Sequence, residues 1–127
     1  MIERPAEGGD ALIVADGVAV GYVRWQKAPR AELEAAGLSE IPDGTIDIDI
    51  AIGEADTIGR GIPSRALKQV MEKLAADRGI PMFIMATSVE NTGAIRACEK
   101  AGFRRLRRFL DPEYGEMWVL TVDRSAV

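Results

Sequence analysis

The sequence contains no histidine and only one cysteine, Cys98. Without histidine, one chain cannot build a Ser-His-Asp triad, a Cys-His pair or a zinc site with histidine ligands. A single cysteine excludes an intramolecular disulfide, which fits a reducing compartment. Proton transfer must therefore use carboxylates, Cys98, Tyr22, Tyr114, lysines or water.

The chain also lacks a basic excess and a long apolar run. Its formal net charge is −4, which argues against nucleic acid as a partner and mildly favours cationic partners. Residues 1–10 are polar, with no apolar core after a basic start, and no apolar run approaches membrane-spanning length. We therefore expect a cytoplasmic protein that binds neither membrane nor nucleic acid, and no metal is implied.

What is present fits one domain over residues 1–127, because 47% of the residues are hydrophobic and can build a normal core. Periodicity and turn residues predict strands at 11–15, 18–25, 45–52, 82–87, 103–110 and 117–122, and helices at 29–36, 63–78 and 92–101. We expect Gly79 to close the second helix and the tail from Asp123 to be frayed. The order predicts an α/β fold of the α+β type, with a mixed sheet that is antiparallel at both ends and has one right-handed parallel crossover.

The segment 45–52, TIDIDIAI, alternates without a break. Isoleucines lie on one face of this predicted strand, and Asp47, Asp49 and Ala51 lie on the other. A central strand has both faces covered, so unpaired aspartates there are costly unless their face opens into a cleft. A carboxylate in such a cleft could orient an ammonium group and accept its proton. The alternative is that both aspartates face solvent on an exposed sheet.

A loop with two glycines, 54–61, leads into the second helix. Such a loop can present backbone N–H groups to an anion, and the helix dipole adds a favourable field. Gly59, Gly61 and Ser64 would line that site, and Arg60 could pair with a phosphate. The loop is neither a Walker loop nor a dinucleotide fingerprint, and the alternative is an ordinary connection.

A second motif, NTGAIRACEKAGF, spans residues 91–103. Asn91 is predicted to be an N-cap, and the buried stripe of the helix is expected at Ala94, Ile95, Cys98 and Ala101. Packing alone also explains this pattern.

Taken together, the two motifs resemble those of the GNAT acetyltransferases. That superfamily carries a Gln/Arg-x-x-Gly-x-Gly/Ala loop at a helix start, matched here by Ile58-Gly59-Arg60-Gly61-Ile62-Pro63. It later carries Asn-x-x-Ala-Ile-x-x-Tyr-Glu-Lys-x-Gly-Phe, matched from Asn91 to Phe103. Residues 48–53, IDIAIG, look most like the aminoglycoside 6'-N-acetyltransferases. The resemblance implies a GNAT-like acyl-CoA N-acyltransferase fold that is N-terminally short, since we expect the chain to start at the second strand of the family, without the usual first strand and helices.

The resemblance implies acetyl-CoA as cofactor and a small-molecule amine as acceptor. The expected acceptor is the 6'-amine of an aminoglycoside, with another small amine or a protein N-terminus as alternatives. Asp49 matches a carboxylate that binds or deprotonates the amine, and Asp47 joins it in the substrate site. Contacts with the cofactor are implied for Ile50, Ala51, Ile52, Ile58, Gly59, Arg60, Gly61, Ile62, Pro63, Ser64, Asn91, Ala94 and Cys98.

The sequence departs from the family pattern at three of these positions. Ile58 replaces the usual Gln or Arg, and Pro63 replaces the second glycine and removes an N–H donor. Cys98 replaces a tyrosine that often protonates the departing thiolate; we interpret it as a packed apolar residue and not as a nucleophile. Tyr114 is an outside candidate for the acid, and a plain turn residue is the alternative.

Two functional hypotheses from other classes stay open. The first is an acyl-CoA-binding module without catalysis, which Pro63, Cys98 and the short N-terminus favour and which Asp49 argues against. The second is a dimerising fragment, in which the open edge of the sheet pairs with a second copy to form a homodimer.

Overall fold

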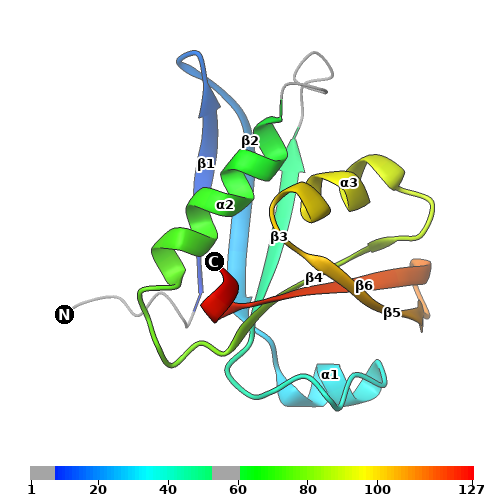
Figure 1. Cartoon of the computed structure of the whole chain (residues 1–127). Coiled ribbons are helices and arrows are strands. Elements are labelled where there is room, and N and C mark those ends of the chain that lie inside the picture. The colour runs from blue at the N-terminus through cyan, green and yellow to red at the C-terminus, as the bar shows by residue number, and fades with distance from the viewer. Residues whose placement is uncertain (1–7, 53–60) are drawn as a thin grey trace.

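The computed structural model describes residues 8–52 and 61–127, and within them six strands form one mixed sheet (Figure 1). The strands are β1 (Gly9–Ala15), β2 (Val18–Lys27), β3 (Ile46–Ile52), β4 (Met82–Ser88), β5 (Arg104–Asp111) and β6 (Gly115–Asp123). The helices are α1 (Arg30–Ala35), α2 (Ile62–Leu74) and α3 (Thr92–Lys100). A short 3₁₀ turn, Arg124–Ala126, ends the chain.

The strands lie in the order β1-β2-β3-β4-β6-β5. Every neighbouring pair is antiparallel except β3 and β4, which are parallel and are connected through α2. This arrangement confirms the predicted α+β fold with antiparallel parts at both ends and one parallel crossover. The Asp16-Gly17 turn of the first hairpin has φ angles of 54° and 78°, the conformation that two-residue hairpins favour.

Helices cover the two faces of the sheet unequally. On one face, α2 and α3 enclose the larger core, where Ile46, Leu67, Phe83 and Leu120 are sealed from solvent. On the opposite face, α1 and the chain that follows it pack over a smaller cluster that includes Leu33, Leu38, Ile41, Ile84 and Val119. Figure 1 shows α1 on the side of the sheet away from α2. The face under α2 and α3 therefore holds most of the core, and α1 covers only part of the opposite face.

Two boundaries differ from the expectation. The second helix ends at Leu74 and not near Gly79, because Asp77 forms a local turn in which its carboxylate accepts the Gly79 N–H at 2.9 Å. Aspartate side chains compete with helical hydrogen bonding in this way. The tail is not frayed: the Arg124 N–H donates to the Pro81 carbonyl at 3.1 Å. In the described part of the chain, no helix is long and apolar enough to cross a membrane.

Candidate active site

The two parallel strands of the crossover part from each other soon after they meet. Their register contains only two pairs, Ile46 with Phe83 and Asp47 with Ile84. On its other side β3 stays paired with β2 over its whole length, from Ile46 to Ile52. Figure 1 shows the β3 and β4 arrows pointing in different directions. Beyond Asp47, no strand in the described part of the chain pairs with the β4-facing edge of β3. Backbone groups on that edge can therefore hydrogen-bond to a ligand.

The predicted alternation of β3 holds in the structure. Ile46 and Ile48 are buried in the larger core, and Ile50 and Ile52 pack against it. Asp47 and Asp49 lie on the opposite face, where Asp47 is half-buried and Asp49 is exposed. The two aspartates, which occupy equivalent positions in the sequence pattern, thus have different environments.

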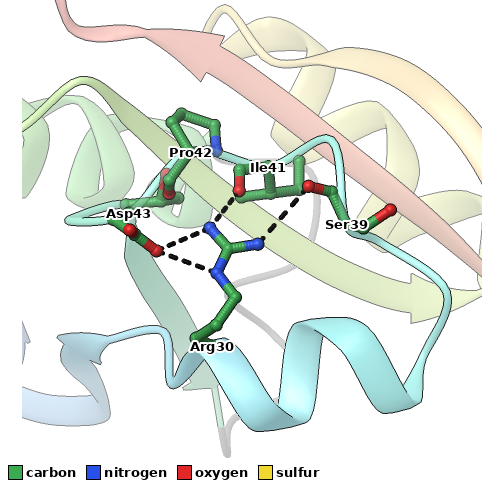
Figure 2. Close-up of polar contacts among 6 residues, drawn as sticks. Arg30, Ser39, Ile41, Pro42 and Asp43 are labelled. Atoms are coloured by element: carbon green, nitrogen blue, oxygen red, sulfur yellow. Dashed lines mark hydrogen bonds and ion pairs between the residues drawn. The ribbon is translucent and has the colours of Figure 1, made fainter.

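Helix α1 covers the aspartate face because an arginine ties it to the following loop (Figure 2). The Arg30 Nε donates to Asp43 Oδ1 at 2.8 Å, and its Nη atoms donate to the carbonyls of Ser39 and Ile41. The Thr45 hydroxyl donates to the Pro42 carbonyl at 2.7 Å, directly before β3 begins. These contacts hold α1 and the loop 39–43 in place beside β3.

Burial and neighbouring charges raise the pKa of Asp47 to about 7. The largest cause is desolvation, followed by the charges of Asp49 on the same strand and Glu32 on α1. Among the described residues, no hydrogen bond or ion pair to the Asp47 carboxylate is found. Every side-chain oxygen that is fully buried in the described part of the chain does have a hydrogen-bond partner, so the Asp47 oxygens are not fully buried. The Asp47 oxygens therefore remain in contact with solvent.

The glycine loop is described only in part, and Ile58, Gly59 and Arg60 lie outside the described residues. Gly61 has a φ of 72°, a left-handed conformation that suits glycine, and it is the N-cap of α2. Ile62 begins the helix, Pro63 follows in its first turn, and the buried Ser64 donates its hydroxyl to the Gly61 carbonyl at 3.1 Å. No side chain of a described residue caps this helix start. Its N–H groups and dipole can therefore face an anion.

The second motif forms α3 as expected. The Asn91 Oδ1 accepts the Ala94 N–H at 3.1 Å, which confirms the predicted N-cap. Cys98 is 2% exposed, and its thiol donates to the Met85 sulfur at 3.6 Å. Burial, with a smaller contribution from the Glu99 charge, raises the pKa of the Cys98 thiol to about 11. A thiol in this environment stays protonated and sits away from solvent.

Tyr114 lies in the turn between β5 and β6 and is 69% exposed. Its pKa is raised, chiefly by a hydrogen bond with Glu113 and also by the charges of Glu113, Asp111 and Asp49. Tyr114 is thus a neutral phenol with a proton to donate.

The basic run of β5 is paired with acidic side chains. Arg105 contacts Glu99 at 3.0 Å, Arg107 contacts Glu40 at 2.8 Å and Arg108 contacts Glu116 at 3.0 Å. Arg105 and Arg108 also lie 5.3 Å from the centre of the Trp118 ring. The run is therefore an ion-paired strand edge.

A groove of about 670 Å³ lies between β1 and α2 and does not include either aspartate. Its walls are mainly apolar, with Ile13, Trp25 and Val70 among the lining residues. The candidate site thus lies apart from this groove. Sequence reasoning missed two features of the site, the Arg30 tie and the burial of Asp47, because both depend on residues far apart along the chain.

Comparison with known proteins places this geometry in context. The family model described as the acetyltransferase (GNAT) domain matches residues 4–110. No curated protein matches the sequence. The chain is similar to the crystal structure of aminoglycoside acetyltransferase AAC(6')-Ib with coenzyme A, with a TM-score of 0.79 and 24% identity over 95% of this chain and 69% of that one. The same figures hold for AAC(6')-Ib with coenzyme A and kanamycin.

A further similar structure is a spermidine N-acetyltransferase chimera from Vibrio cholerae and hSSAT. It has a TM-score of 0.68 and 14% identity over 94% of this chain and 68% of that one. At these identities the structural likeness establishes the fold, and the family match covers most of the chain.

Proposed function

The chain belongs to the GNAT acetyltransferase family, with acetyl-CoA as cosubstrate, and on this premise we propose that it acetylates a primary amine of a polycationic small molecule. The first candidate acceptor is the 6'-amine of an aminoglycoside. One observation carries the proposal: β3 leaves β4 after Asp47, directly beside the exposed carboxylate of Asp49. The unpaired edge of β3, which is free to bind acetyl-CoA, thus lies next to the Asp49 carboxylate, which is suited to bind the acceptor amine.

The described residues fit acetyl-CoA. The start of α2, with Gly61 as its N-cap and no side-chain cap, suits the pyrophosphate. The free edge of β3 at Ile50, Ala51 and Ile52 would hold the pantetheine arm and polarise the thioester carbonyl. Acetyl-CoA supplies an activated acetyl group, so this chain needs only to position the amine, manage its proton and stabilise the oxyanion.

The charge of the aspartate face supports a cationic acceptor. Asp47, Asp49 and Glu32 are close enough for the latter two to raise the pKa of Asp47. Arg24 lies opposite Asp49 across the β2–β3 pair, but its guanidinium is placed over the Tyr22 ring at 5.6 Å. The three carboxylates outnumber this one cation, so an ammonium group bound there would offset negative charge. We assign Asp49, the more exposed carboxylate, to hold the acceptor amine.

The direct test is release of free thiol from acetyl-CoA in the presence of aminoglycosides, polyamines and peptides, with calorimetric titration of CoA alongside. Asp49→Asn is expected to lower turnover by at least about 100-fold and to leave the CoA dissociation constant unchanged. Asp10→Asn is the matched control, because Asp10 is an exposed aspartate of the same sheet, on β1. Equal activity of the Asp49→Asn variant would remove Asp49 from the site. If only polyamines are acetylated, the acceptor is a polyamine and not an aminoglycoside.

A further inference from the structure

An amine that is to attack a thioester must first lose a proton, and the two aspartates of β3 are not equally suited to take it. At neutral pH an aliphatic amine is an ammonium ion, whose nitrogen has no free lone pair. An efficient proton acceptor has a pKa near the working pH. A carboxylate that is partly withdrawn from water is a stronger base than a solvated one, because desolvation disfavours its charged form.

We propose that Asp47 accepts the proton of the acceptor ammonium while Asp49 holds that ammonium in place. This inference rests on the proposed function, since it assigns a role within the same acceptor site. It differs from the family resemblance, which matches Asp49, and not Asp47, to a carboxylate that binds or deprotonates the amine.

The position of Asp47 suits a proton acceptor. Asp47 is the last residue of β3 that pairs with β4, so its side chain lies at the base of the opening between the strands. Asp49 follows two residues later on the same face, nearer the mouth of the opening. On β4, Ala86 lies two residues beyond Ile84, is exposed and carries only a methyl side chain. A side chain that enters the opening would meet Asp49 first and Asp47 below it.

The surroundings of Asp47 also suit a proton acceptor. It is half-buried and has no hydrogen-bond or ion-pair partner in the described part of the chain, yet its oxygens touch solvent. Burying a carboxylate without a partner is unfavourable, and such groups gather at functional sites. A purely structural aspartate would be expected to have a capping or ion-pair partner, as Asp43 and Asp77 do.

The charges that raise the pKa of Asp47 are negative, although one cation, Arg24 of β2, lies opposite Asp49 with its guanidinium over the Tyr22 ring. Asp49 on β3 and Glu32 on α1 are negative, and across the sheet Gln26 of β2 and Ile84 of β4 are neutral. Together with burial, the two negative charges raise the pKa of Asp47 to about 7. The Arg107 guanidinium, on β5, is bound to Glu40 at 2.8 Å. No cation of the described chain is bound to Asp47, so its charged form is free to pair with the ammonium group of the acceptor.

An ammonium N–H proton passes to an Asp47 carboxylate oxygen, which frees the nitrogen lone pair. That pair forms the new C–N bond with the acetyl carbonyl carbon, while the C–S bond breaks and its electrons leave on the CoA thiolate. The nitrogen then loses a second proton, which the thiolate takes up directly or through water. Asp47 afterwards returns its proton to solvent.

The test is the pH dependence of kcat/KM between pH 5.5 and 9, with acetyl-CoA and two acceptors whose amine pKa values differ. We expect kcat/KM to rise with pH through a midpoint near 7, since Asp47 acts only in its charged form. That midpoint should be the same for both acceptors. Asp47→Asn should remove the rise and lower kcat/KM at pH 8 by about 100-fold or more. Glu32→Gln should move the midpoint to lower pH, because it removes a negative charge near Asp47.

Glu34→Gln is the matched control, because Glu34 is exposed on the same helix and does not act on Asp47. A midpoint that follows the acceptor's own pKa, or a rise that persists in Asp47→Asn, would overturn the assignment to Asp47 and leave the proposed function standing. Absence of turnover by the wild-type protein with every amine would overturn both. Thermal melting of each variant separates loss of folding from loss of the proton acceptor.

Discussion

The two faces of β3 differ in almost every physical respect, although their residues alternate along one short strand. Ile46 and Ile48 are 0% and 2% exposed and lie under α2 and α3. Asp47 and Asp49 lie on the face that α1 covers only in part, one half-buried and the other exposed. Because side chains of a strand point alternately to opposite faces, a single strand can anchor the core and present carboxylates to a ligand.

The most severe way to break this difference is to place a carboxylate on the isoleucine face. Ile48→Asp would bury an uncompensated charge in the core, and we expect a loss of at least about 3–5 kcal/mol of unfolding free energy, measured by urea denaturation and circular dichroism. Ala51→Asp is the control, because Ala51 is exposed on the aspartate face of the same strand. Its effect should stay within about 0.5 kcal/mol. Equal damage from both substitutions would contradict the asymmetry of the strand.

A smaller effect of opposite sign is expected on the aspartate face. The pKa of Asp47 is raised to about 7 in the folded protein, whereas an unfolded aspartate titrates near about 3.9. The folded state therefore keeps its proton longer, and folding is progressively disfavoured as the pH rises from about 4 to 7. Above pH 7 the penalty is constant and amounts to at most about 4 kcal/mol, less where water screens the charge.

Asp47→Asn removes this penalty. The variant should be more stable than the wild type at pH 8, and the gain should shrink toward zero as the pH falls toward 4, as followed by thermal melting across that range. Asp10→Asn, at an exposed position of the same sheet, should change stability by less than about 0.5 kcal/mol. A destabilised Asp47→Asn variant at pH 8 would show that the carboxylate has a stabilising partner.

The smallest expected effect concerns Cys98 of α3, which lies in the same core as the isoleucines of β3. Its side chain is buried beside Met85 and burial raises its thiol pKa to about 11, so iodoacetamide should leave it unlabelled at pH 8 in the folded protein. Mass spectrometry should show full labelling once urea unfolds the chain. Rapid labelling of the native protein would mean that the α3 side of the core opens easily, and that Cys98 is available for chemistry.

Most elements of the fold could be predicted from local pattern. The alternation in 45–52 indicated β3, the apolar run at 82–87 indicated β4, and the Asp16-Gly17 pair marked the first hairpin. The end of α2 was predicted wrongly, because a local bond from the Gly79 N–H to the Asp77 carboxylate outweighs helix continuation. The tail was expected to be frayed, but it is ordered, because the Arg124 N–H donates to the carbonyl of Pro81, far away in the sequence.

The candidate site divides in a similar way. By itself, the sequence determined that Asp47 and Asp49 share one face of a strand, because that follows from a period of two. It also determined that proton transfer has no histidine to use, and it carried the motifs of an acetyltransferase. Only the tertiary structure decided that β3 and β4 part after Asp47, and that one aspartate is half-buried while the other is exposed. The reason is physical: besides Asp49 on the same strand, burial and the charge of Glu32 on α1 act on Asp47. The place of α1 depends on the Arg30 contacts and on packing between residues far apart in the sequence, which no local pattern encodes.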